Sequence, residues 1–338
     1  MGSSIPDERS VTPLVGNILM VAVVVVIAVV LIVLSFTFLD STGTPSADAS
    51  FDYRQTPVGL ELVPSTLGTD VVVKLNGQNI THIPADSAGE PVLVPTAPGD
   101  RVTIVSTDDD RSVLVDERID ERSEVGDLVS YYTFEAGSGS TIVDESGNDN
   151  DGEAFDGVTR IGSGSSSALD FDGSSGTYVD IGDLTVDGPD EIDEITIAIR
   201  YEHDGGSGIQ NLIEHQDANF AWFLETDGKH SDPHQMEFNV GYLSSPSGKL
   251  TTGDVPAGEP QTLIGTYDGE RMVLYRNGTK IGTRSFQRDV ALGQIILGAD
   301  SDPNTVGQNF DGRLSEVRLY YATLSQEEVA VLNQAMSG

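Results

Sequence analysis

Oxygen-bearing side chains cluster in segment 144–152, which reads Asp-Glu-Ser-Gly-Asn-Asp-Asn-Asp-Gly. Asp144, Asn148 and Asn150 carry carboxylate and amide oxygens at close spacing on a backbone that two glycines allow to bend. A hard cation such as Ca²⁺ takes about 6–8 oxygen ligands of this kind. The spacing differs from that of an EF-hand loop. The segment therefore predicts a structural calcium site, with a solvated acidic turn as the alternative.

Aromatic residues offer a second candidate site. Trp222, the only tryptophan, is followed by His234 and Tyr242. A flat aromatic face with polar groups beside it is typical of sites that bind sugar rings. These residues are thus candidates for binding a glycan or a protein ligand. The alternative is core packing, because 220–224 also reads as an inward-facing strand.

Several kinds of catalytic chemistry find no support. The chain has no cysteine, which excludes disulfides, a thiol nucleophile and cysteine-ligated metals. The histidines at 203, 215, 230 and 234 lack zinc-ligand spacing. A glycoside hydrolase needs two carboxylates ~5 to ~9.5 Å apart, and none of the 54 acidic residues forms a recognisable catalytic motif. We expect no enzymatic activity, with a hydrolase-like activity as the alternative.

The charge is extreme, since 54 acidic residues stand against 18 basic ones and the formal net charge is −36. Such a chain repels nucleic acid, which is excluded as a favoured partner. The 14 arginines and 4 lysines, together with the acid excess, are typical of halophilic proteins. In ~1 M salt the Debye length is only ~3 Å, so repulsion among the carboxylates is screened. The alternative is an acidic extracellular protein without a salt requirement.

Two N-glycosylation sequons are present, at Asn79 and Asn277. Both fall in predicted hairpins, so we expect at least one to be glycosylated.

The N-terminal part has the pattern of a membrane helix. Residues 10–39 carry no charge, and 14–34 are nearly all Val, Ile, Leu, Ala and Met. About 20 such residues at ~1.5 Å each span the ~30 Å hydrocarbon core. The run is too long for a signal peptide and follows Asp7-Glu8-Arg9 rather than a basic segment. We predict a transmembrane helix over 10–40 and a polar linker over 41–50, giving a single-pass protein of the cell membrane with its C-terminal part outside.

The flank of this helix resembles the amino terminus of type IV pilins from halophilic archaea. The resemblance rests on the run Asp7-Glu8-Arg9-Ser10-Val11-Thr12-Pro13-Leu14-Val15-Gly16-Asn17-Ile18-Leu19-Met20-Val21-Ala22. It implies that a prepilin peptidase cuts between Arg9 and Ser10 and removes a leader, 1–9. The freed helix would then pack against the helices of other pilin subunits in a surface filament. The alternative is an anchor that never polymerises.

Two β-rich regions follow the helix. Residues 51–115 contain strand-length apolar runs and the hairpin signal Asn76-Gly77, which predicts a small β-sandwich resembling a pilin head. Residues 116–126 are dense in charge and are interpreted as a linker.

Residues 127–338 resemble laminin-G-like, concanavalin-A-like jelly rolls. The matching motifs include Ala168-Leu169-Asp170-Phe171-Asp172-Gly173 and, at the far end, Phe310-Asp311-Gly312-Arg313-Leu314-Ser315-Glu316-Val317-Arg318-Leu319-Tyr320. In this family calcium often lies between the early acidic loop and an acidic residue of the last strand, which here is Glu316. Ser325 and Glu328 form a capping box that predicts a short C-terminal helix.

These features together predict a mainly β protein with an N-terminal helix. We expect a pilin-like surface subunit whose jelly roll serves adhesion or the recognition of glycans or surface proteins. The alternative is a non-polymerising, membrane-anchored protein that binds or processes carbohydrate.

Overall fold

The computed structural model describes residues 49–97, 99–108, 112–119, 128–184, 191–206, 208–215, 222–226, 235–240, 248–287, 290–291, 293–300 and 308–337. Over these residues the fold is mainly β, as predicted, with one short α-helix near the C-terminus. The predicted leader, the helix over 10–40 and most of the linker over 41–50 lie outside the described residues. Within the described ranges, no helix has the length and apolar character needed to cross a bilayer.

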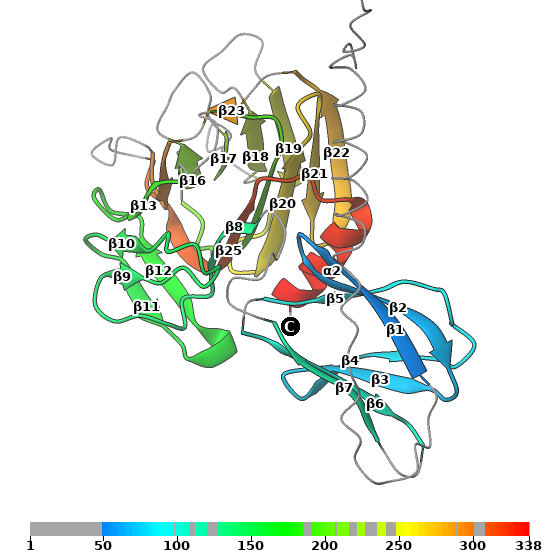
Figure 1. Cartoon of the computed structure of the whole chain (residues 1–338). Coiled ribbons are helices and arrows are strands. Elements are labelled where there is room, and N and C mark those ends of the chain that lie inside the picture. Colours follow the sequence, from blue (N-terminus) through cyan, green and yellow to red (C-terminus); the bar gives the residue numbers. More distant parts are fainter. Residues whose placement is uncertain are drawn as a thin grey trace, which may run out of the picture.

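Residues 49–119 form a small unit of two sheets, drawn in blue and cyan in Figure 1. The strand orders are β1-β2-β5 and β4-β3-β6-β7. The strands are β1 (Ala49–Thr56), β2 (Gly59–Leu67), β3 (Val71–Leu75), β4 (Gln78–Ile83), β5 (Val92–Pro95), β6 (Arg101–Ser106) and β7 (Val113–Arg118). The predicted hairpin at Asn76-Gly77 is confirmed: both residues have positive φ, 51° and 85°, as a tight turn between β3 and β4 requires.

The end of this unit lies later in the chain than the sequence indicated. Strand β7 runs to Arg118, and Ile119 is buried in the core of the unit. Residues 116–119 therefore belong to the small unit and not to the linker predicted over 116–126. Charged side chains on an outermost strand hid the β pattern, and one of them, Asp116, pairs with Arg101 of β6.

The rest of the chain forms a sandwich of two large sheets. The sheet that we call the β15 sheet has the order β11-β12-β25-β15-β20-β21-β22, with β8 also paired to β25. The other, the β16 sheet, has the order β19-β18-β17-β16-β24-β13-β10-β9. A separate two-stranded ribbon joins β14 (Glu191–Ile192) to β23 (Val290–Ala291). The strands of the β15 sheet are β8 (Leu128–Tyr132), β11 (Thr159–Ile161), β12 (Ala168–Asp172), β15 (Ile195–His203), β20 (Gln261–Tyr267), β21 (Arg271–Arg276), β22 (Thr279–Ser285) and β25 (Asp311–Tyr320). Those of the β16 sheet are β9 (Thr141–Ile142), β10 (Gly152–Ala154), β13 (Val179–Asp183), β16 (Gln210–His215), β17 (Trp222–Thr226), β18 (Gln235–Val240), β19 (Gly248–Asp254) and β24 (Gln294–Leu297).

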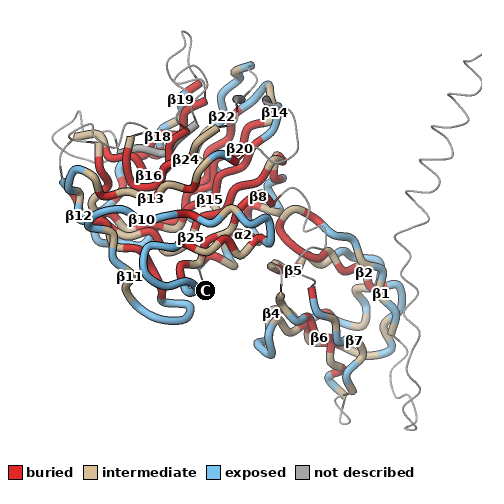
Figure 2. Tube along the Cα trace, turned by 60° about the vertical axis from the view of Figure 1, so that its left-hand side comes forward, coloured by how far each residue is buried: buried red, intermediate tan, exposed pale blue. Residues whose placement is uncertain are grey.

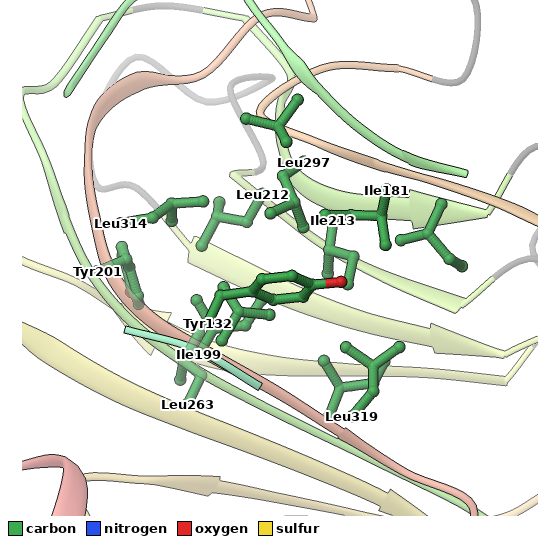
Figure 3. Packing of buried hydrophobic residues seen from close by; sticks show 14 of the residues in the cluster. Tyr132, Ile181, Ile199, Tyr201, Leu212, Ile213, Leu263, Leu297, Leu314 and Leu319 are labelled. Atoms are coloured by element: carbon green, nitrogen blue, oxygen red, sulfur yellow. The ribbon is translucent and has the colours of Figure 1, made fainter. Parts of the chain in front are cut away.

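The main hydrophobic core lies between the two sheets, where Figure 2 shows most of the buried chain. In β15, alternate residues Ile195, Ile197 and Ile199 belong to this core, because successive side chains of a strand face opposite ways. Figure 3 shows the ring of Tyr132 among aliphatic side chains of both sheets. The Tyr132 hydroxyl donates a hydrogen bond of 2.6 Å to the carbonyl oxygen of Asn150, so its polar end is satisfied.

Helix α2 (Gln326–Met336) covers part of the outer face of the β15 sheet. The predicted capping box is confirmed, with Ser325 as N-cap and Glu328 as its partner. A second buried cluster includes Leu332 of α2, Ile264 of β20 and Val58 of the small unit. Strand β20 is consequently buried along its whole length, and α2 also contacts β5 (Figure 1). The helix thus joins the small unit to the sandwich.

Candidate functional site

The acidic segment predicted to bind calcium lies along the edge of β8 that faces away from β25. The Oδ1 atom of Asp144 accepts hydrogen bonds from the backbone N–H groups of Tyr131 and Ser146, both at 2.9 Å. Its Oδ2 atom accepts from the Ser146 hydroxyl at 2.7 Å and from the backbone N–H of Asn150 at 3.0 Å. Because the Glu145 N–H donates to the Tyr131 carbonyl at 2.7 Å, the segment takes the place of a neighbouring strand.

The two asparagines of the segment, Asn148 and Asn150, also bond to the backbone of β8. The Asn148 amide donates to the carbonyl oxygens of Leu128 and Val129, at 2.9 and 3.0 Å. The Asn150 amide donates to the Val129 carbonyl at 2.8 Å. The structure therefore gathers three of the four residues predicted as calcium ligands, and it uses each of them to hold the loop on β8.

Glu316, the fourth predicted ligand, has a different partner. It lies on β25 and accepts a hydrogen bond of 2.6 Å from Nε of Arg318. Burial, reinforced by the charges of Glu135 and Glu316, raises the pKa of Glu145 in the neighbouring loop. In the ranges that the structure describes, no three His, Cys, Asp or Glu side chains are arranged to hold a metal ion. In this conformation hydrogen bonds hold the loop against β8. Calcium binding stays a prediction.

The predicted aromatic site is only partly covered by the described residues. Trp222 begins β17, and its backbone pairs with Val240, a residue of the main core. His234 and Tyr242 lie outside the described residues. Of the other histidines, His203 and His215 are buried in strands of the sandwich.

A polar cluster that the sequence did not single out lies on the outer face of the β16 sheet. Asn211, Glu214, Glu237 and Asn239, which we call the polar face, are only 1%, 7%, 2% and 2% exposed. In β18 the alternate residues Met236, Phe238 and Val240 belong to the main core, so Glu237 and Asn239 face away from it. The register pairs Asn211 with Glu225 of β17, and Glu225 with Glu237 of β18. These three positions therefore form one row across the three strands.

Among the described residues, hydrogen bonds leave two buried oxygens of the polar face without a donor, Oε1 of Glu237 and Oδ1 of Asn211, and only the first has an ion pair. The amide nitrogen of Asn211 donates to the Glu214 carboxylate, and the amide of Asn239 donates to Glu237 at 3.3 Å. The Lys249 ammonium forms an ion pair with Glu237. The Oδ1 atom of Asn211 is buried and has no hydrogen-bond partner within the described part of the chain. A buried acceptor without a donor costs free energy, which a ligand donor in that place would recover.

A sequence signal for part of the polar face exists in segment 235–240. It reads Gln-Met-Glu-Phe-Asn-Val, a strict alternation of polar and apolar residues. The alternation identifies the side that faces away from the core. It does not show that Asn211, on another strand, shares that side.

The two sequons differ in their surroundings. Asn79 lies exposed on β4. Asn277 sits in the turn between β21 and β22 with a φ of 49°. Its amide donates to Oε1 of Gln261, and its Oδ1 accepts from the Thr262 N–H, both at 2.8 Å. Glycosylation stays a prediction at both positions, and the Asn277 amide nitrogen already has a partner.

Comparison with known proteins finds a family model that matches part of the sandwich. Residues 171–330 match the family model described as the concanavalin A-like lectin/glucanases superfamily. No curated protein matches the sequence.

Two solved structures with TM-scores of 0.50 or more support the fold. The binding domain of botulinum neurotoxin serotype G is 11% identical, with a TM-score of 0.52 over 62% of this chain and 51% of that one. The binding domain of serotype D is 14% identical, with a TM-score of 0.50 over 62% and 51%. Domain 4 of AbnA, an extracellular arabinanase from Geobacillus stearothermophilus solved with arabinotriose, is 19% identical, with a TM-score of 0.49 over 61% of this chain and 98% of that one. The chain spans about half the length of the two toxin domains. Residues 171–330 therefore form a concanavalin A-like, laminin-G-like jelly-roll domain.

Proposed function

We propose that the sandwich is a glycan-binding head and that the polar face is its binding site. The observation that carries the proposal is the gathering of four polar side chains on the side of a sheet that faces away from the core, where the Oδ1 atom of Asn211 has no hydrogen-bond partner among the described residues.

The chemistry of the polar face suits a ligand with many hydroxyl groups. Carboxylates accept two hydrogen bonds on each oxygen, and amides both donate and accept. Glu214 and Glu237 can therefore accept hydrogen bonds from sugar hydroxyls, and the amide of Asn239 can donate one. Oδ1 of Asn211 can accept a further hydrogen bond. A protein partner would favour an apolar centre with few charges, which these four residues do not provide.

Binding fits the polar face better than hydrolysis does, although the family includes both lectins and glucanases. A glycosidase needs one carboxyl group that is protonated and can act as the general acid. Glu237 forms an ion pair with Lys249, so its carboxylate already has a cationic partner. Strand β17 also lies between the strands of Glu214 and Glu237, so their backbones are about 10 Å apart across the sheet. We therefore propose recognition without catalysis.

The experiment is a glycan array, followed by titration of the best glycan, in molar salt. We expect Asn211→Ala and Glu237→Gln each to weaken binding about tenfold, the loss typical of a hydrogen bond to a charged or buried group. Glu327→Gln, an exposed carboxylate on α2, is the matched control and should bind as the parent does. Unchanged binding by both polar-face variants would refute the site. Release of reducing sugar that stops in Glu237→Gln would show a hydrolase instead.

We further propose that the head is displayed on the cell surface by a pilin-like helix over 10–40. The support is the uncharged apolar run and the resemblance of 7–22 to archaeal type IV pilins. The partners would be a prepilin peptidase, other pilin subunits and the membrane. N-terminal sequencing of sheared filaments and of membranes tests this. Ser10 in the filament fraction would support a filament subunit, and an uncut N-terminus found only in membranes would support an anchored binding protein.

A further inference from the structure

A cavity of about 440 Å³ lies on the outer face of the β15 sheet, away from the polar face. Its floor is formed by β8, β15 and β25, and its walls by residues around the short 3₁₀ helix η1 (Gly164–Ser166) and by the C-terminal end of α2. Three of the chain's 14 arginines line it: Arg200, Arg313 and Arg318. In a chain with a net charge of −36, such a gathering of cations requires a reason.

Two of the three arginines are fully engaged. Arg313 donates to Asp170 at 3.2 Å and to Glu202 at 3.0 Å. Arg318, with a side chain only 7% exposed, pairs with Glu316 at 2.6 Å. Burial disfavours its charge, but the surrounding groups, Glu316 first among them, together outweigh this and raise the pKa of Arg318. Within each pair the opposite charges neutralise one another, and the hydrogen bonds hold the side chains of the cavity floor in place.

Arg200 is different, because it has no ion pair among the residues that the structure describes. It lies on β15 opposite a bulge of β25, where the register passes from Glu316 to Leu314 and leaves Ser315 as the extra residue. Ser315 also lines the cavity. Bulges of this kind often redirect side chains beside a binding site.

We propose that this cavity binds a sugar acid, with the ligand's carboxylate on Arg200 and its hydroxyls on the surrounding polar groups. A guanidinium forms two parallel hydrogen bonds with a carboxylate, which makes Arg200 the natural anchor. The Ser315 hydroxyl and the carboxylates of Glu135 and Glu202 line the same cavity and accept hydrogen bonds from hydroxyl groups.

Other ligand classes fit this lining less well. A neutral sugar would leave the Arg200 guanidinium without an anionic partner, and the Tyr131 ring already has the guanidinium of Arg318 over it at 4.1 Å. A simple carboxylate, such as an acidic side chain, would meet Arg200 but would also face Glu135 without hydroxyls to offer it. The inference does not depend on the polar face, which belongs to the other sheet.

The test uses the full chain in detergent and molar salt, with glucuronate, glucose and acetate as probes and ligand-observed NMR as the readout. We expect glucuronate to bind, and glucose and acetate to bind at least about tenfold more weakly. Arg200→Gln should weaken glucuronate binding about tenfold or more, with an unchanged circular dichroism spectrum. Arg118→Gln removes an equal charge from an exposed position on β7 and should bind as the parent does.

Each alternative result overturns the inference. Equal binding of glucose would show that the carboxylate is not recognised, and equal binding of acetate would show that the hydroxyls are not. Unchanged binding by Arg200→Gln would place the ligand elsewhere. If Glu237→Gln abolishes glucuronate binding and Arg200→Gln does not, the probe occupies the polar face.

Discussion

Replacing Asp144 by alanine tests whether its carboxylate supports the edge of β8. The substitution removes the acceptor of three backbone N–H groups, those of Tyr131, Ser146 and Asn150. A buried donor left without a partner costs about 1–3 kcal/mol. Tyr131 and Asn150 are half-buried, so water recovers part of that cost. We expect the free energy of unfolding to fall by about 3–5 kcal/mol.

Asp144→Asn is the matched variant. The new amide can keep an acceptor toward Tyr131 and Ser146, but it turns a second donor toward the N–H of Asn150. One orphaned donor corresponds to a loss of about 1–3 kcal/mol. The alanine variant should therefore be less stable than the asparagine variant.

Urea denaturation followed by circular dichroism, at fixed molar salt, measures both losses. The same titrations with CaCl₂ and with EDTA separate the hydrogen bonds from a metal. If calcium binds here, CaCl₂ will stabilise the parent protein and not Asp144→Asn. A loss below about 1 kcal/mol for the alanine variant, or a larger loss for asparagine than for alanine, would refute the hydrogen-bond account.

Three further predictions concern charge, modification and pH. With a net charge of −36, the protein should keep its β signal in circular dichroism in molar salt and lose it on dialysis to dilute buffer, and a spectrum indifferent to salt would contradict this. Peptide mass spectrometry of protein from its source should find glycan on the exposed Asn79 and none on Asn277, whose amide is bonded to Gln261, and the reverse pattern would be contrary to the structure. Burial raises the pKa of Glu145 above 4.5 in the folded state, so its contribution to stability falls as pH rises through that raised pKa. Glu145→Gln should therefore raise the urea midpoint at pH 7, with the gain vanishing below about pH 4.5, whereas a gain that persists in acid would need another cause.

The sequence predicted the features that depend on neighbouring residues. The turn at Asn76-Gly77 needs two positive φ angles, which these two residue types accept, and the N-terminus of α2 needs the Ser325 and Glu328 side chains. Local sequence did not predict which strands pair with each other. Leu169 of β12 lies opposite Leu314 of β25, and no local pattern links two segments so far apart. The resemblance to a jelly roll supplied that connection.

The polar face shows why the site was harder to predict than the fold. The alternation in 235–240 shows that Glu237 and Asn239 face away from the core, but Asn211 joins them only through the register of β16 on β17 and of β17 on β18. A slip of one residue would turn that side chain toward the other face. A bulge between Asn211 and Ile213 adjusts the register further. The acidic loop gives the converse case. Asp144 and Asn148 are neighbours in the sequence, while their hydrogen bonds depend on the backbone of β8. A binding site formed by several strands of a sheet thus depends on the register of those strands. Variants on two different strands, such as Asn211→Ala and Glu237→Gln, therefore test the proposed site more directly than variants within one sequence motif do.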